Sequence, residues 1–416
     1  MRQPSAKTRR WTDWVWRLYE CAPSVLEDAA RWCVPLVLPW LALRVPVAIL
    51  RGPSPYSGRP WVILMAGSQP AIDNVSHRFF ACPPQREVVG SLPLWRLPST
   101  LKRLGASADL VIARVDRLSA RLFFRTPCLV VPESVGSWLA VPDDLNKAAR
   151  ANHSLSEDLR RIRREKLALE VSHTQPDCEV FYHTMYVPYM RKRHGELAIV
   201  RNLPQMRRAF RRGGILWVLR DGQRVAGGLF YQRNDVLYPL AVGTAGGDFT
   251  LTKKGALAAV YFFYLQYAHS QRCTRIDFGG SPPVLNDGLL RYKCKWGARL
   301  TAQSLTHYDY LMRWERPNEQ VIAFLAHRSL IFRRHGQLAA VTALESGNVA
   351  TPDLVRQIHC SLSIPGLQRL FIISSGWKVG NRILTQQTLE QPRAGHESDV
   401  VLCDADHFLQ EFGGVG

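Results

Sequence analysis

The chain has 416 residues, and its 54 Lys and Arg against 34 Asp and Glu give a formal net charge of +20. At roughly 150 residues per domain, this length predicts two or three domains. A hydrophobic fraction of 46% with 21% charged residues excludes a mostly disordered chain. The basic excess predicts attraction to polyanions, which include nucleic acid, anionic lipid and phosphorylated small molecules.

The nine cysteines are scattered along the chain and never form a CxxC pair. This spacing argues against a disulfide framework or a clustered zinc site, and it is typical of a reducing compartment. We therefore expect a cytoplasmic protein without a bound metal. Convergence of distant Cys and His residues on a metal stays open as the alternative.

The most apolar stretch is 33–50, CVPLVLPWLALRVPVAIL. Arg44 in its middle and three prolines are poor features for a helix that spans a membrane. The favoured interpretation is a buried, proline-broken segment of a first lobe. A membrane-surface element, which would bring the protein to the inner face of an anionic membrane, and a spanning helix are the two alternatives.

Three short apolar, β-branched segments at 60–66, 109–115 and 128–132 predict buried strands of an α/β lobe. A helix is expected between the first two, in the segment LPSTLKRLGASA that begins at Leu97. Residues 132–150 have the composition of a linker.

The next stretch, 156–300, alternates helix and strand signals in a regular order. A hairpin is predicted at Asp221-Gly222, a strong two-residue turn signal between apolar runs. The expected order is a helix from 156, a strand at 169–174, helices at 176–195 and 204–213, the hairpin at 214–232, a strand at 236–243, a helix at 252–267, a strand at 273–280 and a helix at 286–300.

The last stretch has helical patterns at 319–332 and 351–362 and a strand pattern at 367–374. Its polar end, from about 381, is expected to be poorly ordered except near HFLQEF (407–412). The chain is thus predicted to comprise a basic and apolar N-terminal segment (1–58), an N-terminal α/β lobe (59–150), a central domain (151–305), a C-terminal extension (306–380) and a polar tail (381–416).

Three motifs of the central domain resemble those of bacterial FemAB-like and BioF2-like acyltransferases, which have the GNAT fold. They are FYHTMYVPYMRKRHG (181–195), RDGQRVAGGLFY (220–231) and IDFGGSPPVLNDGLLRYKCKWGARL (276–300). The resemblance covers about residues 150–305. It implies an α/β fold with a mixed sheet, in which a GNAT-like domain follows a smaller α/β lobe and precedes a small extension.

By this resemblance, the protein would be an enzyme that transfers an acyl group, such as acetyl, from acyl-CoA to an amine or hydroxyl. The acceptor would be an unknown small molecule, glycan or peptide, with envelope or polysaccharide precursors as candidates. An aminoacyl-tRNA donor, as in the FemAB-like enzymes, is the first alternative. A non-catalytic protein that binds RNA or an anionic membrane is the second, since 188–214 carries a high density of Lys and Arg.

The donor's pyrophosphate would need backbone N–H groups at a helix N-terminus. The candidate is GGDFTLTKKGALAA (246–259). Its predicted donor-binding residues are Thr252, Lys253, Lys254, Gly255 and Ala256. The usual GNAT loop, Gln or Arg-x-x-Gly-x-Gly or Ala, is only partly matched, and an ordinary helix cap with two solvated lysines is the alternative.

Four residues are predicted to be catalytic. Asp277, at the end of a strand, would orient or deprotonate the acceptor, or else cap the Gly-Gly bend. Lys293 would stabilise the oxyanion or donor phosphates, or else be a solvated helix lysine. Tyr292 would protonate the leaving group, or else be a core aromatic. His194 would act as a base, or else complement the helix dipole.

The acceptor-binding residues are predicted on the helix at 176–195. Tyr182 and Tyr186 lie on one helical face, where core packing is the alternative role. Arg191 and Arg193 would hold an anionic acceptor. Cys294 lies between two lysines, which predicts a lowered thiol pKa. No GxSxG, HExxH, Walker loop or strand-linked GxGxxG occurs in the sequence.

Overall fold

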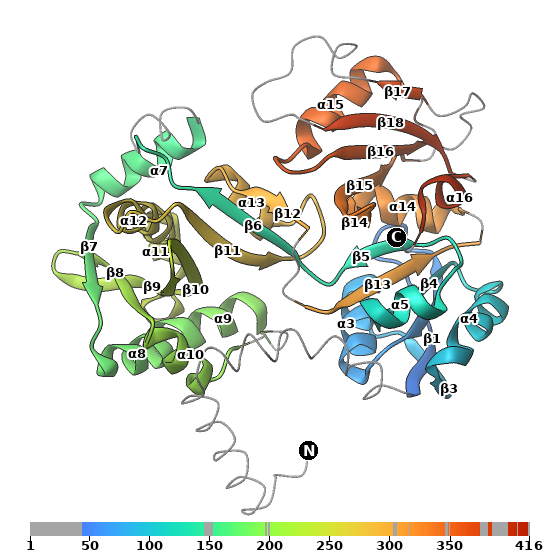
Figure 1. Cartoon of the computed structure of the whole chain (residues 1–416), viewed down its shortest axis with the longest axis horizontal. Coiled ribbons are helices and arrows are strands. Elements are labelled where there is room, and N and C mark those ends of the chain that lie inside the picture. The colour runs from blue at the N-terminus through green and yellow to red at the C-terminus, as the bar shows by residue number, and fades with distance from the viewer. Residues whose placement is uncertain are drawn as a thin grey trace, which may run out of the picture. The chain divides into compact units, whose positions relative to one another are not determined.

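Figure 1 shows the computed structural model of the chain, coloured from the N-terminus to the C-terminus. The chain divides into two compact units. Of the described residues, unit 1 contains those within 137–279 and 295–298, and unit 2 contains those within 44–136, 280–294 and 299–414. The structure describes residues 44–144, 153–195, 198, 200–302, 306–315, 317–345, 348, 350–374, 382–384, 398–405 and 407–414.

The sheet of unit 1 is mixed, and its strands run in the order β6-β11-β10-β9-β8-β7. Neighbours from β7 to β10 are antiparallel, whereas β10 and β11 are parallel. The strands are β6 (Val135–Ala140), β7 (Ala168–Ser172), β8 (Gly213–Arg220), β9 (Gln223–Arg233), β10 (Val236–Thr244) and β11 (Arg275–Ser281).

Helices cover both faces of this sheet. A Cβ added to Gly227 of β9 would lie 3.3 Å from Phe181, and one added to Gly228 would meet Val260 and the Tyr264 hydroxyl. Since consecutive strand residues point to opposite faces, the helices carrying Phe181 and Tyr264 cover opposite faces. The helices of unit 1 are α7 (His153–Arg164), α8 (Gln175–Phe181), the π-helical turn η2 (Tyr182–Tyr186), α9 (Val187–His194), α10 (Leu203–Phe210), the 3-10 turn η4 (Ala245–Gly247), α11 (Phe249–Lys253) and α12 (Ala256–Ser270).

Local sequence explains two of these elements. Asp221 and Gly222 join β8 to β9 with φ of 50° and 74°, so the predicted two-residue hairpin is confirmed. Asn202 accepts a hydrogen bond from the Gln205 backbone while the Gln205 side chain accepts from the Asn202 backbone, which is a complete capping box at the start of α10.

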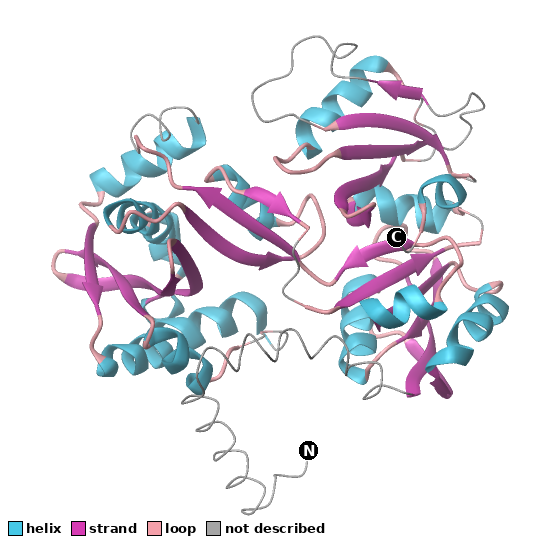
Figure 2. Cartoon of the chain, viewed as in Figure 1, coloured by secondary structure: helices cyan, strands magenta, loops and turns pink. Residues whose placement is uncertain are grey.

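Unit 2 contains an eleven-stranded mixed sheet in the order β17-β18-β16-β15-β14-β5-β13-β4-β2-β1-β3. Helices flank the strands of this sheet, as Figure 2 shows. The strands are β1 (Arg44–Pro53), β2 (Pro60–Ala66), β3 (Gln85–Pro93), β4 (Leu110–Asp116), β5 (Leu129–Pro132), β13 (Tyr308–Arg313), β14 (Leu330–Arg334), β15 (Gln337–Ala343), β16 (Arg369–Ser374), β17 (Arg382–Leu384) and β18 (Asp399–Asp404).

Three clusters of buried apolar side chains pack against this sheet in the described part of the chain. Ile112 of β4 belongs to one of them, with Phe324, and Val111 belongs to a second, with Leu101. The third includes Leu338 of β15 and Leu370 of β16. The remaining elements of unit 2 are β12 (Arg299–Thr301), α3 (Gln69–Phe79), the 3-10 turn η1 (Leu94–Arg96), α4 (Leu97–Gly105), α5 (Arg117–Phe123), α13 (Gly288–Lys295, whose last residue belongs to unit 1), α14 (Glu319–His327), α15 (Pro352–Leu362) and α16 (Phe408–Phe412).

The predicted fold class, α/β with a mixed sheet, is confirmed in both units. The structure nevertheless pairs strands that were predicted to belong to different domains. β4 of the predicted first lobe pairs with β13 of the predicted extension, from Val111↔Arg313 to Asp116↔Tyr308. Buried strands of this kind need a hydrogen-bonded neighbouring strand on each edge, and β4 and β13 are such neighbours for each other.

Two sequence expectations are corrected. The predicted linker at 132–150 includes strand β6. The predicted polar tail contains β18, whose residues from Val400 to Cys403 are buried against β16. For the apolar run at 33–50, residues 44–50 form the start of β1 and are largely buried, in agreement with the favoured interpretation, and residues 33–43 lie outside the described part. Among the described residues, no helix is long and apolar enough to cross a membrane.

Candidate functional site

The parallel strands β10 and β11 separate soon after they begin. Within these fully described strands, pairing covers only Val236↔Arg275 and Leu237↔Ile276. On its other edge, β10 stays paired with β9 as far as Thr244, with a register shift at Leu240. One edge of β10 therefore carries backbone groups that β11 does not pair beyond Leu237, and we call this edge, with the elements around it, the divergence site.

Helix α12 connects these two strands, and its N-terminus has an unusual cap. Gly255, the N-cap, has a φ of 91° in the left-handed region, which favours glycine, and no side chain caps the first turn. The first backbone N–H groups of a helix have no partner within the helix, and they carry partial positive charge. The exposed Lys253 and Lys254 directly precede this N-cap. The segment thus combines open amide donors with two cations.

Thr252, the first residue of the predicted donor segment, differs from the two exposed lysines that follow it in the burial of its side-chain oxygen. Its Oγ1 is buried and has no hydrogen-bond partner among the described residues. A buried hydroxyl without a partner is unfavourable, so it marks a position where a further polar group would be stabilising. Ala256, the last predicted donor residue, is the first residue of α12 and is buried.

Two glycines let a helix approach the end of β10 closely. A Cβ added to Gly243 would lie 2.7 Å from the backbone of Met185, and one added to Gly247 would lie 2.7 Å from the backbone of Pro188. No side chain fits at these distances. The π-helical turn is therefore held directly against one face of β10 near its end, and the start of α9 is held against the η4 turn that follows.

Proline explains the π-helical turn itself. Pro188 lacks a backbone N–H, which disrupts the regular bonding pattern of the preceding turn. The Val187 N–H instead donates to the Tyr182 carbonyl five residues earlier. π-Helical turns of this kind occur frequently at functional sites.

Two buried tyrosines lie beside the divergence site. Arg193 donates a hydrogen bond of 3.0 Å to the Tyr189 hydroxyl, and the Tyr189 ring lies 5.9 Å from that of Phe249 in α11. Burial raises the pKa of Tyr189, and Arg193 opposes this shift. Tyr261 of α12 is fully buried, and both its burial and the nearby Tyr189 raise its pKa well above the ordinary value. Both hydroxyls are therefore held in their protonated form.

The residues predicted to bind the acceptor divide into two groups. Tyr186 is 4% exposed, and its hydroxyl accepts a hydrogen bond from the Arg201 backbone N–H at 3.1 Å, while Tyr182 is half-buried against it. Arg191, Arg193 and the predicted base His194 are exposed on the last turn of α9. The structure thus brings Arg193 to the divergence site through Tyr189.

Asp277 lies in β11 and bonds locally. The Gly279 backbone N–H donates to its Oδ1 at 2.8 Å, and Gly279 has a φ of 67°. This is the turn-holding geometry that the sequence analysis weighed against a catalytic role. One carboxylate oxygen of Asp277 is thereby engaged in holding the bend.

Lys293 and Tyr292 belong to α13 in unit 2. Lys293 is 3% exposed, and its ammonium donates to the Gly280 carbonyl at 2.8 Å and to the Ser281 hydroxyl at 3.0 Å. It is therefore not the solvated helix lysine that was the alternative to a catalytic role. Tyr292 is half-buried. The lowered thiol pKa considered for Cys294 is wrong, because burial raises this pKa to about 11.

Metal ligands do not cluster in the described part of the chain. No group of three or more His, Cys, Asp or Glu residues in these ranges is arranged to hold a metal ion. None of the cysteines in the described ranges is part of a disulfide bond.

Comparison with solved structures finds distant similarities. The C-terminal domain of a putative lysylphosphatidylglycerol synthetase from Agrobacterium fabrum is 11% identical over 67% of this chain and 83% of that chain, with a TM-score of 0.33. FemX is 11% identical over 63% of this chain and 83% of the FemX chain, with a TM-score of 0.34. A GCN5-related N-acetyltransferase from Sphaerobacter thermophilus is 10% identical over 64% of this chain and 74% of that chain, with a TM-score of 0.28.

These TM-scores, all below 0.5, are too low to support an argument about activity. No family model matches the sequence, and no curated protein matches it either. The site described above therefore depends on its own geometry.

Several residues of this site were not predicted. Tyr261 lies in a helix whose apolar composition indicated only core packing. Gly243 and Gly247 flank the segment TAG, and this spacing of glycines at a strand end was the available signal of close backbone approach. Pro188, inside an otherwise continuous helical pattern, was the signal for the π-helical turn.

Proposed function

We propose that unit 1 transfers an acyl group from acyl-CoA to an amine or hydroxyl. The single observation behind this proposal is the N-terminus of α12, which has no side-chain cap, follows Lys253 and Lys254, and connects two diverging strands. Anionic phosphates are stabilised by such amides and cations. An extended thioester would pair with the edge of β10 that β11 leaves open, as peptides pair with a strand edge.

The reaction would proceed by direct attack. The acceptor nitrogen or oxygen forms a bond to the thioester carbonyl carbon, the carbon–sulfur bond breaks, and the thiolate leaves. Backbone N–H groups of β10 would stabilise the oxyanion that forms at the carbonyl. The acceptor proton would pass to His194 or to water, and the departing thiolate would take a proton from Tyr189 or from solvent.

The donor-binding part of this proposal is tested with the double variant Lys253→Gln/Lys254→Gln. We expect its KM for acetyl-CoA or a longer acyl-CoA to rise about tenfold, because two cations near the phosphates are lost. Its kcat should change little, since these residues do not touch the reacting carbonyl. The control is Arg233→Gln, an exposed cation at the end of β9. Absence of saturable acyl-CoA binding to the unaltered protein would refute the acyl-CoA donor.

An aminoacyl-tRNA donor is the second candidate, and helix α7 is the observation that favours it. Leu155, Leu159 and Ile162 are buried along one side of this helix. Arg160, Arg163 and Arg164 are exposed. A row of exposed arginines provides phosphate contacts whose strength falls steeply with salt.

Filter binding of tRNA across a salt series tests this candidate. Near-micromolar binding with a steep salt slope, lost in the triple Gln variant of these arginines, would favour tRNA. The same result without turnover of any aminoacyl donor would favour the non-catalytic RNA-binding alternative. Binding only to anionic vesicles would favour the membrane alternative. Negligible binding of both tRNA and anionic vesicles would exclude the aminoacyl-tRNA donor, the RNA-binding alternative and the membrane alternative.

A further inference from the structure

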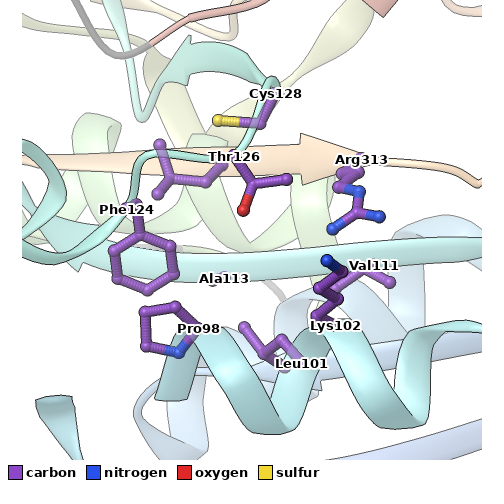
Figure 3. A pocket seen from close by; sticks show the side chains of 10 residues that line it. Pro98, Leu101, Lys102, Val111, Ala113, Phe124, Thr126, Cys128 and Arg313 are labelled. Carbon is purple, nitrogen blue, oxygen red and sulfur yellow. The ribbon is translucent and has the colours of Figure 1, made fainter. Parts of the chain in front are cut away.

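A pocket in unit 2 has no part in the proposed transfer. Its empty volume is ≈ 390 Å³, part of it open to solvent. It lies beside helix α4, strands β4 and β13, and the segment that leads from α5 to β5 (Figure 3). Its lining residues are Pro98, Leu101, Lys102, Val111, Ala113, Phe124, Thr126, Cys128, Leu311 and Arg313.

The floor of this pocket is formed by two strand pairs. Ala113 of β4 is paired with Leu311 of β13, and Val111 is paired with Arg313. Ala113 contributes only a methyl group between larger neighbours, so the floor is hollow at this point. The strand register therefore places the Val111–Arg313 pair, which contains a cation, next to the uncharged Ala113–Leu311 pair.

The pocket is polarised along its length. Figure 3 shows Lys102 and Arg313 beside Val111 at one end, and Phe124 and Pro98 near Ala113 at the other. One end is therefore cationic and the other is apolar.

The remaining polar groups suit a ligand that is bound without covalent chemistry. Burial raises the pKa of the Cys128 thiol to about 12, so this thiol stays neutral and unreactive at physiological pH. Arg313 forms an ion pair with Glu315, an exposed residue outside the lining. The Arg313 side chain is itself 18% exposed, and its guanidinium has further N–H donors.

From this arrangement we infer that the pocket binds a single-tailed amphiphilic anion, with its alkyl chain against Phe124, Pro98 and Ala113. The head group, a carboxylate or a phosphate monoester, lies between Lys102 and Arg313. Apolar burial supplies most of the binding energy for the tail. The guanidinium fork and the ammonium select a negative head group.

The test is calorimetric titration of the full chain with octanoate and with octyl phosphate. Acetate and octylammonium are the controls. Acetate has the carboxylate without the octyl chain, and octylammonium has the octyl chain with a positive charge. We expect saturable binding of at least one of the two octyl anions and none of acetate or octylammonium. If only one octyl anion binds, it identifies the head group. Failure of both to bind, or equal binding of octylammonium, would overturn the inference.

Variants locate the site. Lys102→Gln/Arg313→Gln should weaken octyl-anion binding by on the order of tenfold or more, since charge-assisted bonds are lost. The matched control is Arg103→Gln, the next residue on α4, which does not line the pocket. Ala113→Leu should abolish binding by filling the hollow, and circular dichroism checks that this variant is folded.

Glu315→Gln gives the opposite prediction. It removes the group that now pairs with Arg313, so binding of the octyl anion should strengthen severalfold. A Lys102→Gln/Arg313→Gln variant that binds as tightly as the unaltered chain would overturn the inference even if Ala113→Leu fails to fold.

Discussion

The Lys295 ammonium lies 2.6 Å from the Asp158 carboxylate, and the Asp158 side chain is only 6% exposed. Asp158 belongs to α7, and Lys295 is the last residue of α13 and the first of the short segment 295–298 that belongs to unit 1. Arg161 is a second, more distant partner of the same carboxylate at 3.6 Å. This ion pair ties a surface helix to a segment that is far away in sequence.

Replacement of Lys295 should destabilise unit 1. Lys295→Met leaves a nearly buried carboxylate with only Arg161 nearby. We expect the free energy of unfolding to fall by about 2 kcal/mol, less than for a fully buried pair, because Arg161 remains. Urea unfolding followed by circular dichroism measures this change.

An exposed pair on the same helix is the control for that measurement. Arg160 pairs with Glu157 at 2.7 Å, with side-chain exposures of 75% and 39%. Arg160→Met should change the free energy of unfolding by less than about 0.5 kcal/mol. Equal effects of the two substitutions would contradict the role given to Lys295.

Gly228 should tolerate no side chain. A Cβ at this position would lie 2.0 Å from the Tyr264 hydroxyl and 2.8 Å from a Val260 methyl carbon. Gly228→Ala is expected to destabilise the protein by about 2 kcal/mol through overpacking. Tyr264→Phe removes the clashing oxygen, so the double variant should lose less stability than the sum of the single variants. Strict additivity in thermal unfolding would show that α12 does not pack on β9 in this way.

Stability should fall at alkaline pH through the buried tyrosines. Burial and Tyr189 raise the pKa of Tyr261 far above its ordinary value of 10.0, whereas an unfolded tyrosine ionises near that value. Above pH 10 the unfolded state therefore releases a proton that the folded state keeps, and stability is lost as pH rises, by at most about 1.4 kcal/mol per pH unit for one group. Tyr261→Phe should flatten this loss between pH 10 and 11.5 relative to the unaltered chain, as measured by urea unfolding. An unchanged slope would refute the assignment.

Lys293→Met should separate a structural from a catalytic role for this lysine. The substitution leaves the Gly280 carbonyl and the Ser281 hydroxyl without their buried donor, which should reduce the free energy of unfolding by about 2 kcal/mol. If Lys293 only holds this turn, kcat of the proposed acyl transfer per folded molecule stays close to that of the unaltered protein. A large loss of kcat with little loss of stability would support the predicted catalytic role.

Local signals in the sequence predicted many of the elements. The Asp221-Gly222 turn, a helix at 252–267 and a strand at 273–280 were predicted from residue chemistry that acts within a few positions, and the structure has the turn, α12 at Ala256–Ser270 and β11 at Arg275–Ser281. The same reasoning treated 176–195 as one regular helix, because the effect of Pro188 on the preceding turn depends on where neighbouring carbonyls find partners.

Features that depend on distant partners were not predictable in this way. The segment DVVLCD of β18 is short and lies in a polar region, and it becomes a buried strand only because β16 pairs beside it. The burial of Lys293 likewise depends on the bend at Gly280 and Ser281, since nothing in its own helix indicates it. For the candidate site, the sequence identified the donor segment but missed Tyr261, whose position among apolar residues resembles core packing.

The eleven-stranded sheet has a consequence for synthesis on the ribosome. Most of unit 1, from Ser137 to Gly279, is continuous, so it can fold as soon as this stretch has emerged. Strands β1 to β4 leave the ribosome earlier, yet β4 obtains its partner β13 only when Tyr308–Arg313 has been made. Until then its apolar edge is open to pairing with other chains. During this period of synthesis, folding of the nascent chain competes with aggregation at this edge.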